Sequence, residues 1–236
     1  MSHVCSAALQ LKNHKRNFRN RAPSWLLAVA LSLSLGVGSS QTLPDGVSEV
    51  PFVCPPRERD ADDEPPVTEE EIQEAARRAA YREVFPAYLS VVPEEPDTTL
   101  FMPVEGIRVR DVVDTWGAAR SEGRSHEGTD IFAAQGTPIY SATPGYIYRI
   151  GPARRGGQTV TVVGGAGRRY YYAHLSAYAD DIREGQKVTT DTLLGYVGDT
   201  GNAITTPYHL HFGVYASEGD VCDWDALNPY PFLVDR

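Results

Sequence analysis

Four histidines and an aspartate fall into three short clusters in the second half of the chain. The clusters are His126-Glu-Gly-Thr-Asp130, Tyr172-Ala-His174-Leu175 and His209-Leu-His211-Phe212. In the first cluster, a bend at Gly128 would let His126 and Asp130 face one ion. In the third, a strand would place both imidazoles on one face, about 6.6 Å apart, with Leu210 and Phe212 facing a core. Neighbouring buried imidazoles need polar partners, which a metal and a reacting water supply.

The clusters together offer more donors than the three protein ligands that a catalytic zinc takes. Nitrogen and carboxylate donors without cysteine fit zinc, and a spare imidazole fits the general base that hydrolysis requires. Each cluster alone also fits a structural role, such as a surface ion pair at His126 and Asp130 or a core histidine at His174. The spacing does not decide which of His209 and His211 would be a ligand.

The segments that carry these clusters are predicted to be short β-strands. From about Leu100 the chain is rich in β-branched and aromatic residues bounded by glycine and proline, and no βαβ rhythm is present. These features predict an all-β, mostly antiparallel domain over residues 96–236. The expected strands lie at residues 106–110, 137–142, 145–150, 158–163, 168–173, 193–197 and 209–215.

A Pro-rich, acidic arm and a helix precede the β region, over residues 41–95. Thr68 and Glu71 have the spacing of a capping box, and Pro86 is expected to end the helix at Phe85. A modest apolar face is expected on this helix, formed by Ile72, Ala75, Ala76, Ala79 and Val84. Two hypotheses stay open: a surface helix packed on the domain, or a pro-segment that covers the active site.

Residues 1–40 are typical of an export signal. Five basic residues and no acidic one lie in this segment, and an apolar run of about 13 residues, Trp25–Val37, precedes Gly38-Ser39-Ser40. The run is short for a membrane span, so we expect a cleaved signal peptide, with an uncleaved signal anchor in the membrane as the alternative. After cleavage Cys54 and Cys222 would remain, either paired or free.

The charge of the exported chain excludes some partners. The full chain has a net charge of −9, and without the five basic residues of the signal 17 basic and 31 acidic residues remain, a net −14. Nucleic acid is therefore not an expected partner, because its binding requires positive charge. Anionic polymers of the cell wall are poor candidates for the same reason.

The three clusters, in this order, resemble the lysostaphin-type (LytM-like) zinc endopeptidases of bacterial cell walls. Further similar segments are Gly136-Thr-Pro138, Gly145, Gly185-Gln-Lys-Val188 and Gly195-Tyr-Val-Gly-Asp-Thr-Gly-Asn202. The resemblance covers residues 100–233. It implies an antiparallel β sandwich of the duplicated hybrid motif type, with a groove floored by a sheet.

The resemblance also implies residue roles. His126, Asp130 and His211 would hold Zn²⁺, while His174 and His209 would activate water and stabilise the transition state. Tyr140 and Tyr172 would line either the groove or the core. The implied substrates are peptides of peptidoglycan stems or cross-bridges, met in the periplasm, in the cell envelope or outside the cell. The alternative function is a non-catalytic wall-binding or regulatory module of the same fold.

Overall fold

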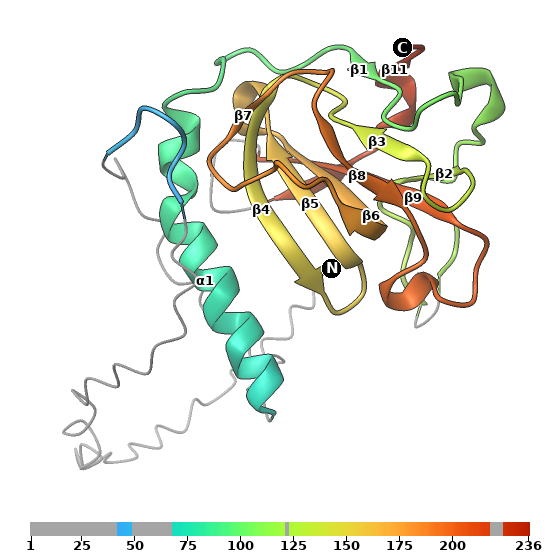
Figure 1. Ribbon diagram of the computed structural model, residues 1–236, viewed down its shortest axis with the longest axis horizontal. Helices are drawn as coiled ribbons and strands as arrows, with labels where there is room; N and C mark the ends of the chain where they lie inside the picture. The colour runs from blue at the N-terminus through green and yellow to red at the C-terminus, as the bar shows by residue number, and fades with distance from the viewer. Residues whose placement is uncertain (1–41, 49–67, 121–122, 218–223) are drawn as a thin grey trace, which may run out of the picture. The chain divides into compact units, whose positions relative to one another are not determined.

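The computed structural model describes residues 42–48, 68–120, 123–217 and 224–236 (Figure 1). The expected export signal and all three cysteines lie outside these ranges, as does most of the acidic arm. Within them the chain forms one helix followed by short strands. No helix of the described residues is long and apolar enough to span a membrane.

Eleven strands follow the helix α1 (Glu69–Leu89) within the described residues. They are β1 (Leu100–Phe101), β2 (Thr129–Phe132), β3 (Pro138–Tyr140), β4 (Gly145–Ala153), β5 (Gly157–Val163), β6 (Arg169–Tyr178), β7 (Lys187–Val188), β8 (Leu193–Val197), β9 (His209–Ala216), β10 (Asp225–Leu227) and β11 (Leu233–Val234).

Nine of these strands belong to one hydrogen-bonded network. Its main path runs in the order β10-β9-β6-β5-β4-β7, β2 adds to β9, and β8 joins β3 to β6. All pairings in the network are antiparallel, whereas β1 and β11 form a separate parallel pair. The expected mostly antiparallel all-β fold with a preceding helix is therefore confirmed.

The core forms on one face of this sheet because its strands alternate apolar and polar side chains. On β9, Leu210 and Phe212 are fully buried, and Tyr170 and Tyr172 of β6 are buried beside them. The rings of Tyr172 and Phe212 lie 5.2 Å apart. This packing fixes β6 against β9 and leaves the alternate positions of both strands facing the other side of the sheet.

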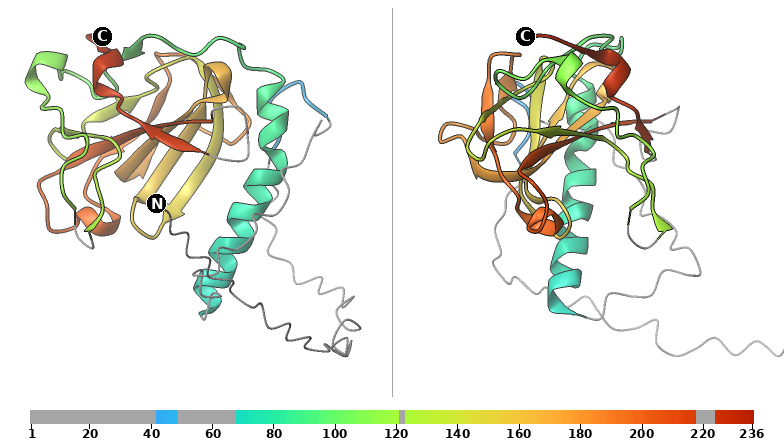
Figure 2. Two further views of the ribbon diagram at one scale, coloured as in Figure 1. Left: turned by 180° about the vertical axis from the view of Figure 1, so that it is seen from behind. Right: turned by 90° about the vertical axis from the view of Figure 1, so that its right-hand side faces the viewer.

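The helix α1 packs beside β4 through an aromatic cluster (Figures 1 and 2). Tyr81, Phe85 and Tyr88 of α1 surround Tyr148 of β4, with ring centroids 5.2–5.4 Å apart in edge-on contacts. The Tyr148 hydroxyl donates a hydrogen bond to the Tyr81 carbonyl at 2.7 Å. These contacts match the hypothesis of a helix packed on the domain.

Two details of the helix prediction were wrong. The helix does not end at Phe85 but continues through Pro86 to Leu89, because Phe85, Ala87 and Tyr88 are buried and hold the last turn in place. The expected apolar face was wrong in part, since the Ile72 side chain is 53% exposed whereas Val84 packs against the aromatic cluster. Tertiary packing of the aromatic residues, rather than helix periodicity, decides which face is buried.

The segment 106–110 was predicted to be a strand and is not one. Its end enters a short 3-10 helix at Val109–Asp111, and the Asp235 carboxylate accepts a hydrogen bond from the Val109 amide at 2.7 Å. Gly106 has a φ of +73°, a left-handed conformation that turns the chain just before this segment. A tertiary contact and a turn thus replace the strand.

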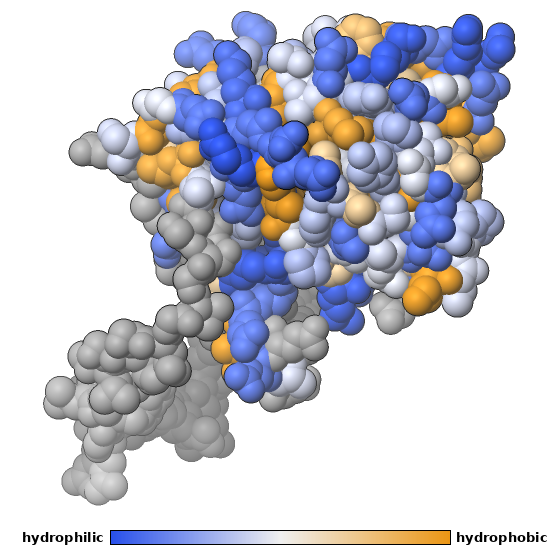
Figure 3. Space-filling view, in the orientation of Figure 1, coloured by the Kyte–Doolittle hydropathy of each residue, from blue (hydrophilic) through white to orange (hydrophobic). Residues whose placement is uncertain are grey.

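The surface seen in Figure 3 is mainly hydrophilic, and its apolar side chains gather in small separate patches. Isolated apolar residues are normal on a protein surface. Three large apolar side chains with considerable exposure, Phe132, Ile204 and Tyr208, lie on β2 and in the segment before β9.

Candidate metal centre

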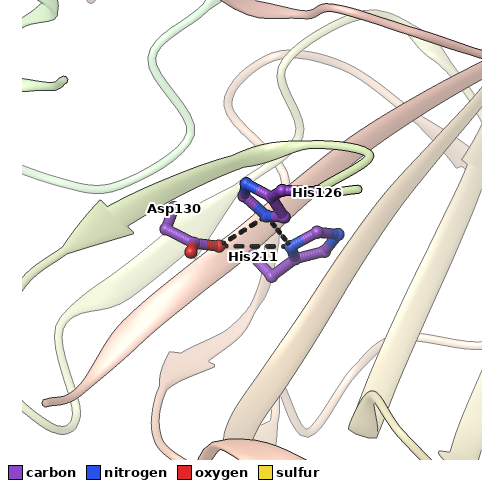
Figure 4. Close-up of side chains that lie close together, drawn as sticks. All are labelled: His126, Asp130 and His211. Carbon is purple, nitrogen blue, oxygen red and sulfur yellow. Dashed lines mark hydrogen bonds and ion pairs between the residues drawn. The ribbon is translucent and has the colours of Figure 1, made fainter. Parts of the chain in front are cut away.

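The side chains of His126, Asp130 and His211 lie together and point toward one another (Figure 4). His126 Nε2 is 2.9 Å from His211 Nδ1 and 3.1 Å from Asp130 Oδ1, and His211 Nδ1 is 3.2 Å from the same oxygen. His126 and Asp130 are almost fully buried. Three potential donors therefore converge on one small volume.

Strand pairing positions two of these residues. Asp130 of β2 and His211 of β9 are directly opposite partners in the antiparallel ladder, so their side chains project from the same face. The Asp130 amide also donates to the Thr115 hydroxyl at 3.1 Å, and His126 sits just before β2 with its Nδ1 2.8 Å from the Thr115 carbonyl. The loop containing Thr115 thus fixes His126 and gives Asp130 a second anchor.

The chain bends at Gly128, as expected, and the absence of a side chain there also provides space. The φ of Gly128 is not in the left-handed region, but a Cβ at this position would lie 2.6 Å from His211 Cε1 and 2.8 Å from His211 Nε2. The backbone of the first cluster therefore lies flat against the His211 ring. Glycine between His126 and Asp130 therefore serves both the expected bend and this close contact.

The donors fit a tetrahedral cation. A carbonyl only accepts hydrogen bonds, so His126 must donate from Nδ1 to Thr115, which leaves the Nε2 lone pair directed into the cluster. The guanidinium of Arg120 holds Asp130 Oδ2 and leaves Oδ1 for the cluster. Donors bound to zinc at about 2.0–2.2 Å lie roughly 3.4 Å from one another, close to the separations of 2.9–3.2 Å here.

His174 and His209 flank the cluster, with ring centroids 5.0 Å apart. His209 Nε2 lies 3.8 Å from Asp130 Oδ1. Each ring donates from Nδ1 to a backbone carbonyl at 2.8 Å, that of Thr200 for His174 and that of Pro207 for His209. In the neutral form each therefore keeps an unprotonated Nε2 that can accept a proton.

His174 reaches the site through a bulge in β6. Tyr172 and Leu175 are fully buried in the core, where they pair with Val160 and Gln158 of β5. The three steps along β6 from Tyr172 to Leu175 thus face only two steps along β5, and His174 has a φ of +66°. Regular alternation would have sent the His174 side chain into the core with Tyr172. Left-handed backbone is rare for a non-glycine residue, and its cost is commonly tolerated where function requires it.

Burial and hydrogen bonding set the charge states of the cluster. Burial would raise the pKa of Asp130, but the neighbouring side chains of His126 and His211 and the Arg120 guanidinium outweigh this effect and hold that pKa well below the usual range. Burial lowers the pKa of His211, and it lowers the pKa of His174 to about 4. At neutral pH these shifts keep Asp130 ionised and His211 and His174 neutral, the forms in which such groups bind metals and accept protons.

The cluster lies in a groove of about 900 Å³. Tyr171 and Tyr215 line this groove, whereas Tyr172 is buried in the core and Tyr140 lies against Arg236 outside it. The sequence analysis did not single out the two lining tyrosines. If the bulge at His174 had been recognisable from the sequence, the alternation of side chains along β6 would have predicted that Tyr171 lines the groove.

Six arginines also line the groove, and none was singled out from the sequence. They are Arg78, Arg120, Arg124, Arg149, Arg155 and Arg169. They come from α1, from the segment before β2, and from strands β4 and β6 or the turn after β4. Because these arginines lie far apart in the sequence, their position on one common surface could not be predicted from it.

An antiparallel β domain with a His–Asp–His group and two flanking imidazoles matches the expected class of hydrolase with a metal site. Residues 124–224 match the model of the peptidase family M23. An L-Ala–D-Glu endopeptidase of Bacillus subtilis is 39% identical over 126 residues, which cover 50% of this chain and 38% of that protein. The match therefore spans well under two thirds of the relative.

Two solved structures are also similar. The structure of LytU is 30% identical, with coverage of 51% of this chain and 82% of that chain and a TM-score of 0.43. The catalytic domain of lysostaphin from Staphylococcus simulans is 28% identical, with coverage of 52% and 93% and a TM-score of 0.45. Residues 124–224 thus form a peptidase M23 domain, and the expected resemblance to the lysostaphin-type peptidases is confirmed.

Proposed function

We propose that this protein is a zinc endopeptidase that hydrolyses peptide bonds in peptidoglycan stems or cross-bridges. The observation that carries the proposal is the pair of imidazoles, His174 and His209, beside the three converging donors. A binding module would need no proton acceptors at this position. The relatives described above include an L-Ala–D-Glu endopeptidase and lysostaphin, which supports peptidase activity on cell-wall peptides.

His126, Asp130 and His211 would hold the zinc ion. When bound, zinc would supply Lewis-acid polarisation of the scissile carbonyl and activation of water. Arg120 keeps the Asp130 carboxylate oriented, and Thr115 fixes the ring of His126 through its carbonyl. Such outer hydrogen bonds orient metal ligands and maintain their basicity.

One of His174 and His209 would take the proton of the attacking water at Nε2. The other would stabilise the developing oxyanion only as an imidazolium that donates from Nε2, and a protonated imidazole would then deliver a proton to the leaving amine. The Thr200 and Pro207 carbonyls keep both rings in the tautomer that accepts at Nε2. The low pKa of His174 keeps that ring unprotonated at neutral pH.

We also propose that the chain is exported through residues 1–40 and acts in the periplasm, in the cell envelope or outside the cell. The net charge of −14 without this segment makes nucleic acid an unsuitable partner. Sequencing the amino terminus of the protein recovered from the envelope would test the export signal. A mature chain that starts near Gln41 would support cleavage, and an intact terminus would support a membrane anchor.

The function is tested by incubating the protein with purified peptidoglycan and measuring new free amino termini. We expect release by the wild type and a loss of about 10²- to 10⁴-fold in His209→Ala. Metal analysis separates the roles: His126→Ala should lose zinc, whereas His174→Ala should keep zinc and lose activity. Absence of cleavage by zinc-loaded wild type, with retained binding to peptidoglycan, would instead identify a non-catalytic wall-binding module.

A further inference from the structure

The groove has a charge opposite to that of the chain as a whole. Six arginines line it against two acidic residues, Glu127 and Asp130, although the chain carries a net charge of −9. Local positive charge in a concave site attracts anionic groups more strongly than the same charge on a convex surface. The groove therefore differs from the acidic surface that disfavours anionic polymers.

Among the described residues, two carboxylates pair with three of these arginines, Arg78, Arg120 and Arg149. Asp130 binds Arg120 but is also a member of the candidate metal centre. Glu74 of α1 lies 3.2 Å from Arg149 and 3.9 Å from Arg78, and it also pairs with Arg77. A single carboxylate outside the groove lining thus serves three guanidinium groups.

Arg169 is the arginine whose contacts leave most hydrogen-bonding capacity unused. Its guanidinium lies 3.4 Å from the centre of the Trp224 ring and 5.6 Å from that of Phe85, so the Trp224 ring covers one of its faces. Its Nε has no hydrogen-bond partner, and no ion pair with a carboxylate involves it in the described part of the chain. Burial lowers the pKa of Arg169 to about 10, which leaves the group charged at neutral pH.

Stacking leaves the edge of a guanidinium open. The N–H donors of arginine lie in its plane, so a ring on its face does not compete with a carboxylate at its edge. The stacked geometry also reduces the side-chain freedom that would be lost on binding a ligand. Arg169 is thus preorganised for a bidentate interaction with a carboxylate.

The position of Arg169 relates it to the proposed reaction centre. Arg169, Tyr171 and Ala173 project from the same face of β6, and Ala173 is the cross-strand partner of His211. Four residues of a strand span roughly 13 Å, a length that an extended peptide covers with about four residues. Because an arginine side chain is long, the substrate must cover less than this distance between its scissile bond and its carboxylate.

We propose that this groove selects peptides with a free carboxylate within about four residues of the scissile bond, and that Arg169 determines this specificity. The inference rests on the proposed peptidase function and refines its substrate class. Uncharged peptides, such as bridges made only of glycine, would leave Arg169 buried without a partner. Such an unpaired charge lowers affinity for the neutral substrate.

The test compares soluble peptidoglycan fragments before and after their carboxylates are converted to carboxamides with carbodiimide and ammonia. The full exported chain is assayed for kcat/KM, and the metal-free protein is titrated with both fragment sets by calorimetry. We expect wild type to prefer the free carboxylates roughly 10- to 100-fold in kcat/KM. Arg169→Gln should lose most of this preference, and Arg169→Lys should retain part of it.

Arg110→Gln is the matched control, because Arg110 lies outside the groove with its side chain 76% exposed. The control should keep the preference of the wild type. Equal cleavage of both fragment sets by the wild type would overturn the inference and leave the peptidase function standing. Arg169-dependent binding of carboxylates without any cleavage would support the inference and refute the peptidase function, whereas neither binding nor cleavage would refute both.

Discussion

Replacing Gly128 with alanine tests the packing of the candidate metal centre. The new Cβ would lie 2.6 Å from His211 Cε1 and 2.8 Å from the Phe212 carbonyl oxygen. Ordinary contact between carbon atoms requires about 3.5 Å, so the His211 ring must move by roughly 0.9 Å if the backbone stays fixed. The carbonyl belongs to the β2–β9 ladder and cannot easily yield, so most of the movement falls on the ring.

A movement of this size exceeds what a metal site tolerates. Ligand distances must stay within about 0.2 Å of their ideal values, and His211 Nδ1 now lies 2.9 Å from His126 Nε2. We expect Gly128→Ala to weaken zinc binding at least 10- to 100-fold, in the range found for lost orienting contacts. Competition with a chromophoric chelator measures this change.

Glu127→Ala provides the control, because Glu127 is exposed and neighbours the glycine without touching the cluster. This variant should bind zinc as the wild type does. Circular dichroism of the metal-free proteins should show that both variants fold, since the φ of Gly128 is accessible to alanine. Wild-type zinc affinity in Gly128→Ala would refute the reasoning, because the ring position would then not depend on this contact.

Three further predictions concern the packing around the site. Phe85→Ala should lower the free energy of unfolding by about 3–5 kcal/mol in urea titrations, because Phe85 is 2% exposed; a loss below about 1 kcal/mol would show that α1 contributes little. Between pH 6.5 and 4 unfolded His174 binds a proton that the folded state excludes. The metal-free wild type should therefore lose about 1–2 kcal/mol from pH 7 to 5, and His174→Asn should lose less. Thr200→Ala removes a hydroxyl that donates to the Leu175 carbonyl at 2.8 Å and accepts from the Gln158 amide at 2.9 Å. Because the Thr200 carbonyl also holds His174, activity should fall about tenfold with zinc content unchanged.

The parts of the site that strand geometry governs were predictable from the sequence. Residues two apart on a strand share a face, so His209 and His211 could be placed together, with Leu210 and Phe212 opposite them in the core. The four-residue spacing of His126 and Asp130 also predicted that these two side chains could face the same ion. That these segments meet in space followed from the family resemblance and not from periodicity.

Features that depend on long-range packing were not predictable. The bulge at His174 reverses the alternation of β6, so Tyr171 rather than Tyr172 lines the groove. The helix passes through Pro86 because buried aromatic residues on both sides of it stabilise the last turn. Each case is a local preference that tertiary contacts override.

The arginines of the groove show a different limit. Overall composition gave an acidic protein, and a net charge carries no information about where the positive residues gather. Arg78 and Arg169 lie far apart in sequence and line the same groove only because α1 packs beside β4. The sequence analysis therefore excluded anionic polymers without indicating a site for single carboxylates.

The opposed positions of Asp130 and His211 limit how the length of the chain can change. A single residue inserted in β9 between Leu210 and His211 would put His209 and His211 on opposite faces of the strand, so that one of the two imidazoles faced the core. The same insertion in the exposed segment that ends at Tyr208 would add only to a loop. Length variants of this protein should therefore remain functional when they alter that loop and fail when they alter either strand.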